Sequence, residues 1–593
     1  MKKDIAWDLS EIFPGVTDPS VKKAIDSIIK VAEGFARKYQ GKIKQLSGKQ
    51  LLGCIKDLEA FQVKLGDVSS FAGLSFAANM TLPGTQSLYD KVSKTEAKLG
   101  KMLAFFELEA GVLVNKKPKI ISEPVLKNYR HALERLRRQV KHQLSEIEEQ
   151  LVIEKDQFGV RAWQDLQAKW LNTRMFAVEV EGKKRNLSYG EANGLLHHPD
   201  RATRESANKS IYGRLGESGE VFSSALRSIC NDWLMVCERR KYDSPMHASL
   251  IANDTNQQII ENLLKAIEDH ASLYRRYLKL KAKLMGLPRL GCHDIVAPLH
   301  DAPKMKFTYG KAKDLIIKAY TKFDEEYAFA VKDMFARKHI DSSPRFGKQN
   351  GAFCSSWYDG KSAFILDSFN EASTDVYTLA HELGHATHDY YWETNQTIVN
   401  GNIPMIVAET ASIFGELLLT DLLLSEAKSN KQKKAIICSV LDEAGMAAFQ
   451  VTARAWFEQS LYDAIKREEF LDYKTICKYW TAARNKIYGD TVEWFDVMEA
   501  EWTMKPHYYL ANFRFYNYPY VYAQMFVYAL YQKYREEGKR FVPKFKKILS
   551  AGSSISPKEI AKTVDLDITD PDCWKLGMKQ YEHFIEELEK TIN

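Results

Sequence analysis

The sequence predicts a mainly α-helical fold with a small β element. Apolar residues recur at three- and four-residue spacing along much of the chain, with charged residues between them, as in helices that bury one face. Of the 593 residues, 45% are hydrophobic and 12% aromatic, which is ample for a large core. Only 17 residues are proline, and no stretch has the composition of a flexible linker. We therefore expect one continuous body or two tightly packed lobes.

The individual elements follow from the same patterns in chain order. The helical pattern is clearest over 22–39, 51–65, 88–113, 124–153 and 257–284. A strand pair is expected over 176–187, where apolar and polar residues alternate around a turn at Gly182-Lys183. A helix is expected to follow from about Tyr189.

A second strand is expected over 362–369, an apolar and aromatic run that follows a turn at 358–361. Such a strand could accept an extended peptide by edge pairing, which binds main chain and tolerates many side chains. A buried structural strand explains the pattern equally well.

The charge balance argues against a polyanionic partner. Lys and Arg total 84 and Asp and Glu total 77, so the net charge of +7 is small for this length. No run of 18 or more uninterrupted apolar residues indicates a membrane span, and the first residues lack the apolar core of a signal peptide. The sequence thus predicts a soluble protein without nucleic-acid or membrane partners, and leaves its oligomeric state open.

The eight cysteines indicate a reducing compartment. None of them pair in C-x-x-C spacing, so neither a structural zinc knuckle nor a disulfide framework is indicated. A cytoplasmic location is expected.

The most informative motif is His381-Glu382-Leu-Gly-His385, on a helix expected near 375–390. Residues i and i+4 share one helix face, so both imidazoles can bind one zinc ion at about 2.0–2.1 Å. Glu382 would lie beside the ion, where its carboxylate can take a proton from zinc-bound water. Gly384 needs a packing or functional reason, because glycine inside a helix costs about 1 kcal/mol. Two histidines leave the site incomplete, so a third ligand is required.

Glu409 is the candidate third ligand. The segment 407–419 has the pattern of a second, mostly apolar helix with Glu409, Ser412 and Glu416 on one face. Carboxylates on such a helix are costly to bury unpaired, and a metal or a metal-bound histidine would satisfy them. We assign Glu409 to the metal and place Ser412 and Glu416 around the ligands, although a salt bridge explains Glu416 equally well. His388 is then an outer or core histidine.

These motifs resemble the thimet oligopeptidase and oligoendopeptidase F family of zinc metallopeptidases, most closely the oligoendopeptidase F branch. The similar segments are His381-Glu-Leu-Gly-His385-Ala-Thr-His388, Glu409-Thr-Ala-Ser412-Ile-Phe-Gly-Glu416, Gly351-Ala-Phe-Cys-Ser-Ser356, Ala363-Phe-Ile-Leu-Asp-Ser368, His507-Tyr-Tyr, Phe515-Tyr-Asn-Tyr-Pro-Tyr520 and Trp7-Asp8-Leu9. The resemblance spans nearly the whole chain, and its specific motifs lie between about 350 and 525.

The resemblance implies the chemistry of the site. One Zn²⁺ ion would be bound by the three ligands assigned above, with Glu382 as the general base. His507, together with Tyr516 or Tyr518, would direct hydrogen-bond donors at the carbonyl oxygen of the scissile peptide, where the tetrahedral intermediate gathers negative charge. The spacing of the many tyrosines in this region does not select between Tyr516 and Tyr518.

The resemblance also implies the architecture and the substrate. The expected fold is a large, elongated, two-lobed helical body with a deep substrate cleft and a small β element beside the zinc helix. We expect an N-terminal helical lobe over 1–170 and a catalytic zinc metallopeptidase region over 171–593. Such a cleft would admit short unstructured peptides and exclude folded proteins. The expected activity is zinc-dependent hydrolysis of internal bonds in short peptides.

Two alternatives keep the fold and change the function. A zinc carboxypeptidase of a related helical fold would need a cation to bind the terminal carboxylate of its substrate, and Arg454 and Arg514 are candidates. A non-catalytic peptide-binding protein would bind no zinc, yet every expected ligand and the base are present in this sequence.

Overall fold

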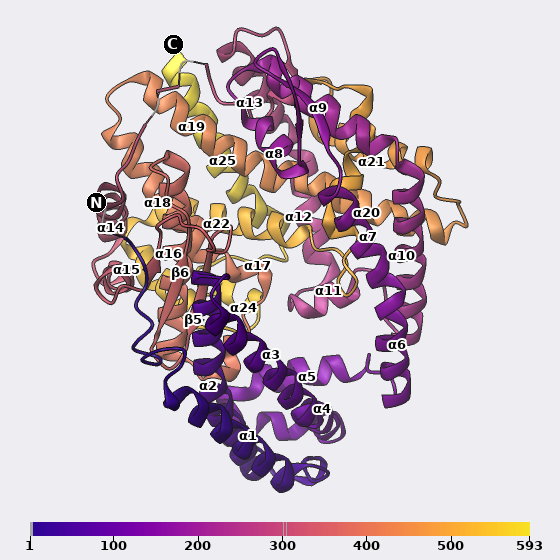
Figure 1. The fold of residues 1–593 in the computed structure, drawn as a ribbon, viewed down its shortest axis with the longest axis vertical. Coiled ribbons are helices and arrows are strands. Elements are labelled where there is room, and N and C mark those ends of the chain that lie inside the picture. The colour runs from indigo at the N-terminus through magenta and orange to yellow at the C-terminus, as the bar shows by residue number, and fades with distance from the viewer. Residues whose placement is uncertain (1–3, 301, 304, 593) are drawn as a thin grey trace. The chain divides into compact units, whose positions relative to one another are not determined.

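The protein is mainly α-helical, as the periodicity predicts. The computed structural model describes residues 4–300, 302–303 and 305–592, and the strands among them are few and short. Figure 1 labels the helices and strands and colours them by residue number. The chain forms two compact units, each assembled from separate segments of sequence. Unit 1 comprises Met1–Lys141, Met305–Ser425 and Lys533–Asp567, and unit 2 comprises His142–Lys304, Glu426–Gln532 and Ile568–Asn593. The predicted lobes, 1–170 and 171–593, are a different division and stay a prediction.

Unit 1 contains the N-terminal helices together with the elements that carry the predicted metal ligands. Its helices are α1 (Pro19–Tyr39), α2 (Gly48–Ala78), α3 (Pro83–Leu103), α4 (Phe105–Lys116), α5 (Arg130–Val140), α14 (Tyr309–Phe323), α15 (Tyr327–Ala336), α16 (Ser373–Asn395), α17 (Met405–Ala408), α18 (Thr410–Glu426), α23 (Val542–Ser550) and α24 (Pro557–Lys562). Helices α1 to α5 contribute to one shared apolar core.

Helix α1 shows how local sequence forms these elements. Asp18 caps it by accepting a hydrogen bond from the Ser20 backbone N–H, and Pro19 occupies the first turn, where its missing N–H has no cost. Its buried residues recur every three or four positions: Val21, Ile25, Ile28, Ala32, Phe35 and Tyr39. The predicted helix over 22–39 is therefore confirmed.

Other predicted helices have different limits. The helix predicted over 51–65 extends to Gly48–Ala78. The pattern over 88–113 forms two helices, α3 and α4, which are separated at Ala104. The pattern over 124–153 is also divided, because Ser145 and Glu148 form a capping box that starts a new helix, α6 (Glu146–Phe158), in unit 2.

A small sheet packs against α16, the helix that carries the His-Glu-x-x-His motif. Its strands are β4 (Ile340–Asp341), β5 (Phe353–Trp357) and β6 (Ser362–Leu366), in the order β4-β6-β5, with β5 and β6 antiparallel. The predicted β element beside this helix is thus confirmed. β6 is central and fully buried, so the buried structural interpretation of this strand is correct and β6 itself cannot pair with a peptide. β5 lies at the edge.

Unit 2 is also helical. Its helices are α6, α7 (Val160–Asn172), α8 (Tyr189–Gly194), α9 (Arg201–Gly216), α10 (Gly219–Arg240), α11 (His247–Ala252), α12 (Gln257–Asp269), α13 (Ala271–Leu284), α19 (Asn430–Gly445), α20 (Val451–Lys466), α21 (Tyr473–Tyr488), most of α22 (Tyr518–Glu537) and α25 (Pro571–Ile592). The strands are β1 (Phe176–Val180) and β2 (Lys183–Leu187), which form a hairpin, and β3 (Leu290–Gly291) and β7 (Val492–Glu493), which pair in parallel.

Three unit 2 segments bear on the predictions. The strand pair and the helix from Tyr189 are confirmed, but the turn consists of Glu181 and Gly182, which both have positive φ.

The helical pattern over 257–284 forms two helices, α12 and α13, which are separated at His270. The continuous helical run Asn430–Lys466 is long and apolar enough to cross a membrane, but 61% of its most apolar window is buried inside the protein, as in a core helix.

Candidate metal centre

Helix α16 presents the motif from a well-capped position. The Asp375 carboxylate reaches back over the first turn and accepts hydrogen bonds from the backbone N–H groups of Ala372 and Asn370, at 2.9 and 2.6 Å. The helix then continues without interruption through His381 and His385, so both imidazoles project from the same face.

Gly384 brings a second helix close to this face. A Cβ atom at position 384 would lie 2.5 Å from both the Ala411 carbonyl oxygen and the Ser412 Cα. Only glycine therefore allows the start of α18 to approach the backbone of α16 at this point. This contact is the packing reason that the sequence demanded for Gly384, and it places the segment preceding α18 beside the histidines.

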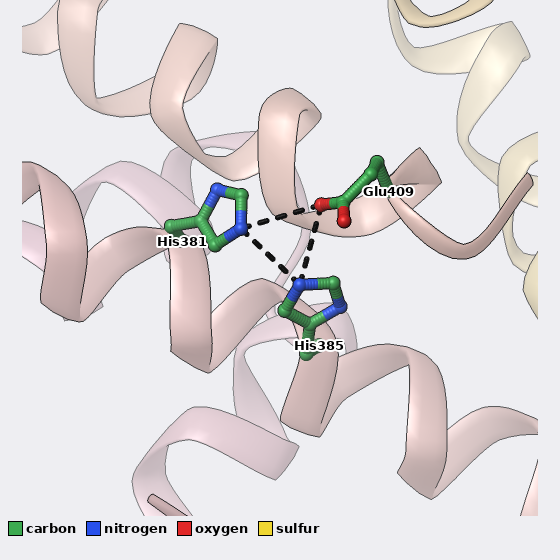
Figure 2. A group of neighbouring side chains, drawn as sticks. All are labelled: His381, His385 and Glu409. Atoms are coloured by element: carbon green, nitrogen blue, oxygen red, sulfur yellow. Dashed lines mark hydrogen bonds and ion pairs between the residues drawn. The ribbon is translucent and has the colours of Figure 1, made fainter. Parts of the chain in front are cut away.

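The structure brings the three predicted ligands together (Figure 2). The Nε2 atoms of His381 and His385 are 3.2 Å apart. The Glu409 Oε2 atom lies 3.3 Å from each of them. Glu409 lies at the junction between α17 and α18, with φ −82° and ψ 10°, so the expectation of one continuous helix over 407–419 is wrong by one turn.

These separations fit a divalent metal ion. Tetrahedral zinc with ligands at about 2.0–2.1 Å places neighbouring donor atoms about 3.3–3.4 Å apart, which matches all three observed separations. Two imidazoles and one carboxylate are also the donor set that catalytic zinc sites use, with the fourth position open. The three side chains are 24% to 30% exposed, so water and substrate can reach the donors.

The three predicted ligands also have hydrogen-bond partners around them. The His381 Nδ1 atom is 2.5 Å from the Glu416 carboxylate, and the Ser412 hydroxyl donates a hydrogen bond to Glu409 at 2.6 Å. Burial alone lowers the pKa of His381, but its hydrogen bonds to Glu409 and Glu416 outweigh burial and raise the pKa to about 11. Burial raises the pKa of Glu409, yet hydrogen bonds from both histidines hold it far below its usual range.

Glu382 has the environment of a general base. Its side chain is 7% exposed, and burial raises the pKa of its carboxyl against the lowering effect of His381 and His385. A carboxylate with a raised pKa accepts a proton more readily at neutral pH. His388 lies outside the donor triad, and burial lowers its pKa to about 4, so it remains neutral at pH 7. The assignment of Glu409 rather than His388 as the third ligand stays a prediction.

Comparison with known proteins identifies the family. The model of peptidase family M3 matches residues 194–580, and the oligopeptidase F model matches residues 117–172. The chain belongs to peptidase family M3. It is therefore an enzyme that hydrolyses peptide bonds, a metallopeptidase.

Individual relatives of this M3 peptidase cover its whole length. Oligopeptidase PepF of Bacillus subtilis is 27% identical over 602 residues, which is 100% of this chain and 88% of that protein. Group B oligopeptidase PepB of Streptococcus agalactiae is 27% identical and covers 99% of this chain and 97% of its own. A Chlamydophila abortus protein of known structure has the same fold at 22% identity, with a TM-score of 0.89 over 99% of this chain and 98% of that one. Oligoendopeptidase-F from Enterococcus faecium shares the fold at 23% identity, with a TM-score of 0.68, over 96% of this chain and 98% of that one.

The other predicted site residues of the M3 peptidase lie in unit 2. Burial lowers the pKa of His507 to about 4, with a further contribution from Arg454 and Lys505, so its imidazole is neutral at pH 7. The ring of Tyr516 lies 5.4 Å from that of His507 and is half-buried. Tyr518 is fully buried, and its hydroxyl accepts hydrogen bonds from two neighbours, Ser249 and Asn253.

Sequence reasoning missed two acids that continue the face of the zinc motif. His381, His385, Asp389 and Glu393 follow one another at four-residue spacing on α16, a repeat that the printed sequence contains. Asp389 accepts a hydrogen bond from the Trp392 indole at 2.9 Å, and burial raises its pKa to about 6. Burial and the charge of Asp389 raise the pKa of Glu393 to about 9, so Glu393 is protonated at pH 7.

Replacing Glu393 with Gln should change how stability depends on pH. The folded protein keeps the Glu393 proton up to about pH 9, whereas the unfolded chain releases it near 4.5, so this group makes wild-type stability fall as pH rises between those values. Glutamine has nearly the same shape and no proton to lose. The free energy of unfolding of E393Q, measured by denaturant titration, should therefore rise relative to wild type by up to about 1.4 kcal/mol per pH unit between pH 5 and 8. E107Q, at an exposed site in α4, is the control, and parallel curves for E393Q and wild type would contradict the assignment.

Proposed function

We propose that this M3 peptidase is a zinc-dependent oligoendopeptidase that hydrolyses internal bonds of short, unstructured peptides. The observation that carries the proposal is the donor triad, whose separations of 3.2, 3.3 and 3.3 Å match those of tetrahedral zinc ligands. The names of the relatives, oligopeptidase PepF and oligoendopeptidase F, support the class of substrate and the internal position of cleavage.

The residues of the triad and its neighbours have different roles in the reaction. His381, His385 and Glu409 hold the ion, and Glu416 and Ser412 fix the orientation of two of these ligands. A bound zinc ion would polarise the substrate carbonyl and acidify the attacking water. Glu382 takes the proton of that water and can deliver it to the leaving amine nitrogen.

We propose His507 and Tyr516, rather than Tyr518, as the donors to the scissile carbonyl oxygen. His507 is neutral at pH 7 and so keeps one N–H to donate, and its Nδ1 atom has no hydrogen-bond partner among the described residues. The Tyr516 ring is next to it and is partly exposed, whereas Tyr518 is fully buried beside Ser249 and Asn253, where a substrate cannot reach its hydroxyl. Donors aimed at the developing negative charge lower the barrier directly.

Edge strand β5 is the candidate peptide-binding strand. A cavity of about 490 Å³ is lined by Phe353 and Cys354 of β5 and by Glu382 and His385 of the zinc motif. Main-chain pairing along β5 would hold an extended peptide with little regard to its side chains. An extended strand requires an unstructured substrate, which supports oligopeptides over folded proteins.

A peptide blocked at both ends tests the endopeptidase assignment. An acetylated, amidated peptide of about ten residues should be cut at internal bonds by the zinc-loaded enzyme, and mass spectrometry identifies the two products. A zinc carboxypeptidase requires a free terminal carboxylate, so cleavage only of an unblocked peptide would refute the proposal. Arg514, one candidate for that terminal contact, is 3% exposed and donates to the carbonyl groups of Leu510 and Phe513, which supports a structural role.

We also propose that the enzyme works in the cytoplasm. All eight cysteines are free thiols, and seven of them are buried, as expected in a reducing compartment.

A further inference from the structure

Unit 2 contains a cavity of about 680 Å³. His507 forms part of its wall. Much of the wall is apolar, with Met446, Met498 and Trp494 among its residues, and a few polar groups converge on it. Its size and its mixture of apolar surface with a few placed polar groups are those of a ligand site, and methionine side chains adapt to varied ligands.

The polar part of this cavity carries both signs of charge, since Arg454 and Lys505 line it together with Asp442, Glu443 and Glu501. Lys505 pairs with Glu501 at 2.9 Å and is 8% exposed. Arg484 is 5% exposed, lies 3.9 Å from the centre of the Trp494 ring and is influenced by the same Glu501. Arg454 also lines this cavity, close enough to repel the charge of Lys505, whereas Arg484 is not one of the lining residues. Burial and repulsion from Arg454 lower the pKa of Lys505 to about 8.

Arg454 is the cation without a partner acid. Its guanidinium donates one hydrogen bond, to the Gln450 side-chain oxygen, and its Nε atom is buried with no hydrogen-bond partner. Among the described residues, no carboxylate lies within 4.0 Å of this guanidinium. Arg454 as a whole is only partly buried, but a buried guanidinium atom without a hydrogen-bond partner has a cost that a bound anion would remove.

The local helix geometry holds Arg454 in this position. Between α19 and α20 the helix forms one π-helical turn, Met446–Gln450, which places Gln450 and Met446 on the cavity wall. The Gln450 side chain accepts a hydrogen bond from Arg454 one turn later and donates one to Glu501 at 3.4 Å. π-Helical turns inside long helices occur frequently at functional sites.

We propose that this cavity binds a carboxylate group of the peptide, with Arg454 as its anchor. The planar guanidinium can form two parallel hydrogen bonds to a carboxylate, which gives both affinity and orientation. A peptide offers this group at its C-terminus or on an Asp or Glu side chain. This inference rests on the proposed function, because it takes the ligand to be a peptide.

Equilibrium binding to the full-length, zinc-loaded E382Q protein tests the proposal without consuming the peptide. Isothermal titration compares three acetylated peptides: one without acidic residues that ends in a free carboxylate, its C-terminal amide, and the amide with one internal Glu. The same titrations are done with R454Q and R214Q introduced into that protein. Arg214 is the matched control, since it is exposed and pairs with Glu217 on the surface of unit 2.

With the R214Q control, the peptide carrying the recognised carboxylate should bind about tenfold more tightly than the plain amide, the size expected for a charged hydrogen-bond pair. R454Q should remove most of that difference and leave the affinity for the plain amide unchanged. If R454Q removes the affinity advantage of the peptide with the free C-terminus, the recognised group is the terminal carboxylate. If R454Q removes the advantage of the peptide with the internal Glu, the recognised group is a side-chain carboxylate.

Equal weakening of all three peptides, or no change in any of them, would overturn the proposal. R454K serves as a second variant in case R454Q does not fold. Lysine keeps the positive charge but lacks the planar guanidinium group, so R454K should retain only part of the affinity difference between the carboxylate peptide and the plain amide. Hydrolysis by the wild-type enzyme is measured separately. Its absence would refute the proposed function while leaving the carboxylate preference measurable, whereas hydrolysis without that preference would refute only this inference.

Discussion

Glu382→Gln should abolish peptide hydrolysis while the protein keeps its metal. Glutamine preserves the size of the side chain and cannot accept the proton of the attacking water. General-base catalysis contributes about 10² to 10⁴ in rate, so kcat should fall by at least about 100-fold. Neither His381 nor His385 depends on Glu382 for its donor contacts, so metal content measured by mass spectrometry should remain at one ion per chain.

The control for this variant is E107Q, the same substitution at an exposed site of unit 1. It should leave both kcat and metal content unchanged. A near wild-type kcat in E382Q would refute the assignment of Glu382 as the base. A loss of metal in E382Q would instead show that this side chain supports the ligand set rather than the proton transfer.

Glu409→Ala should remove the metal itself. The carboxylate is 3.3 Å from each of the two imidazole nitrogens, so its loss leaves only two protein donors for the ion. Metal affinity should fall by more than about 100-fold, beyond the roughly 10- to 100-fold that loss of an outer partner causes. Titration of the metal-free protein with a competing chelator measures the affinity, and hydrolysis should disappear with the ion.

Glu416→Gln tests whether the loss of a ligand's hydrogen-bond partner weakens metal binding less than the loss of a ligand does. Glu416 contacts the far nitrogen of His381, so its replacement should weaken metal binding within that 10- to 100-fold range and leave some activity at high zinc.

E107A is the control for the Glu409→Ala substitution and should bind metal like the wild type. An E409A protein that retains one tightly bound ion would contradict the assignment of Glu409 as a ligand.

Much of the candidate metal centre was predictable because its parts are local in sequence. The His-Glu-x-x-His spacing places two imidazoles on one helix face wherever that helix packs. The unexplained acid Glu409 on an apolar segment indicated the third donor. The continuation of the same face through Asp389 and Glu393 was readable in the same way, but the reason for these acids, a buried protonated carboxyl, depends on the strand that covers them.

Other features depended on packing that spacing does not encode. The tyrosines at 516 and 518 are equivalent by composition, and only burial shows that the Tyr518 hydroxyl is already bonded to Ser249 and Asn253. The apolar run that forms β6 is a central strand, so the edges of the sheet belong to β4 and β5. The break at Ser145 arises from a local capping box, a signal that was present in the sequence but was outweighed by the surrounding apolar periodicity.

Helical periodicity was sufficient to predict the fold class, the helix that carries the motif and the residues on its face, because these depend on backbone geometry within a few turns. The approach of Glu409 to the two histidines was decided by the contact of Gly384 with the backbone of Ala411, which brings two helices together. The unpaired guanidinium of Arg454 was likewise decided by its neighbours in space. Such long-range contacts are set by the packing of whole elements, whose positions no short stretch of sequence specifies.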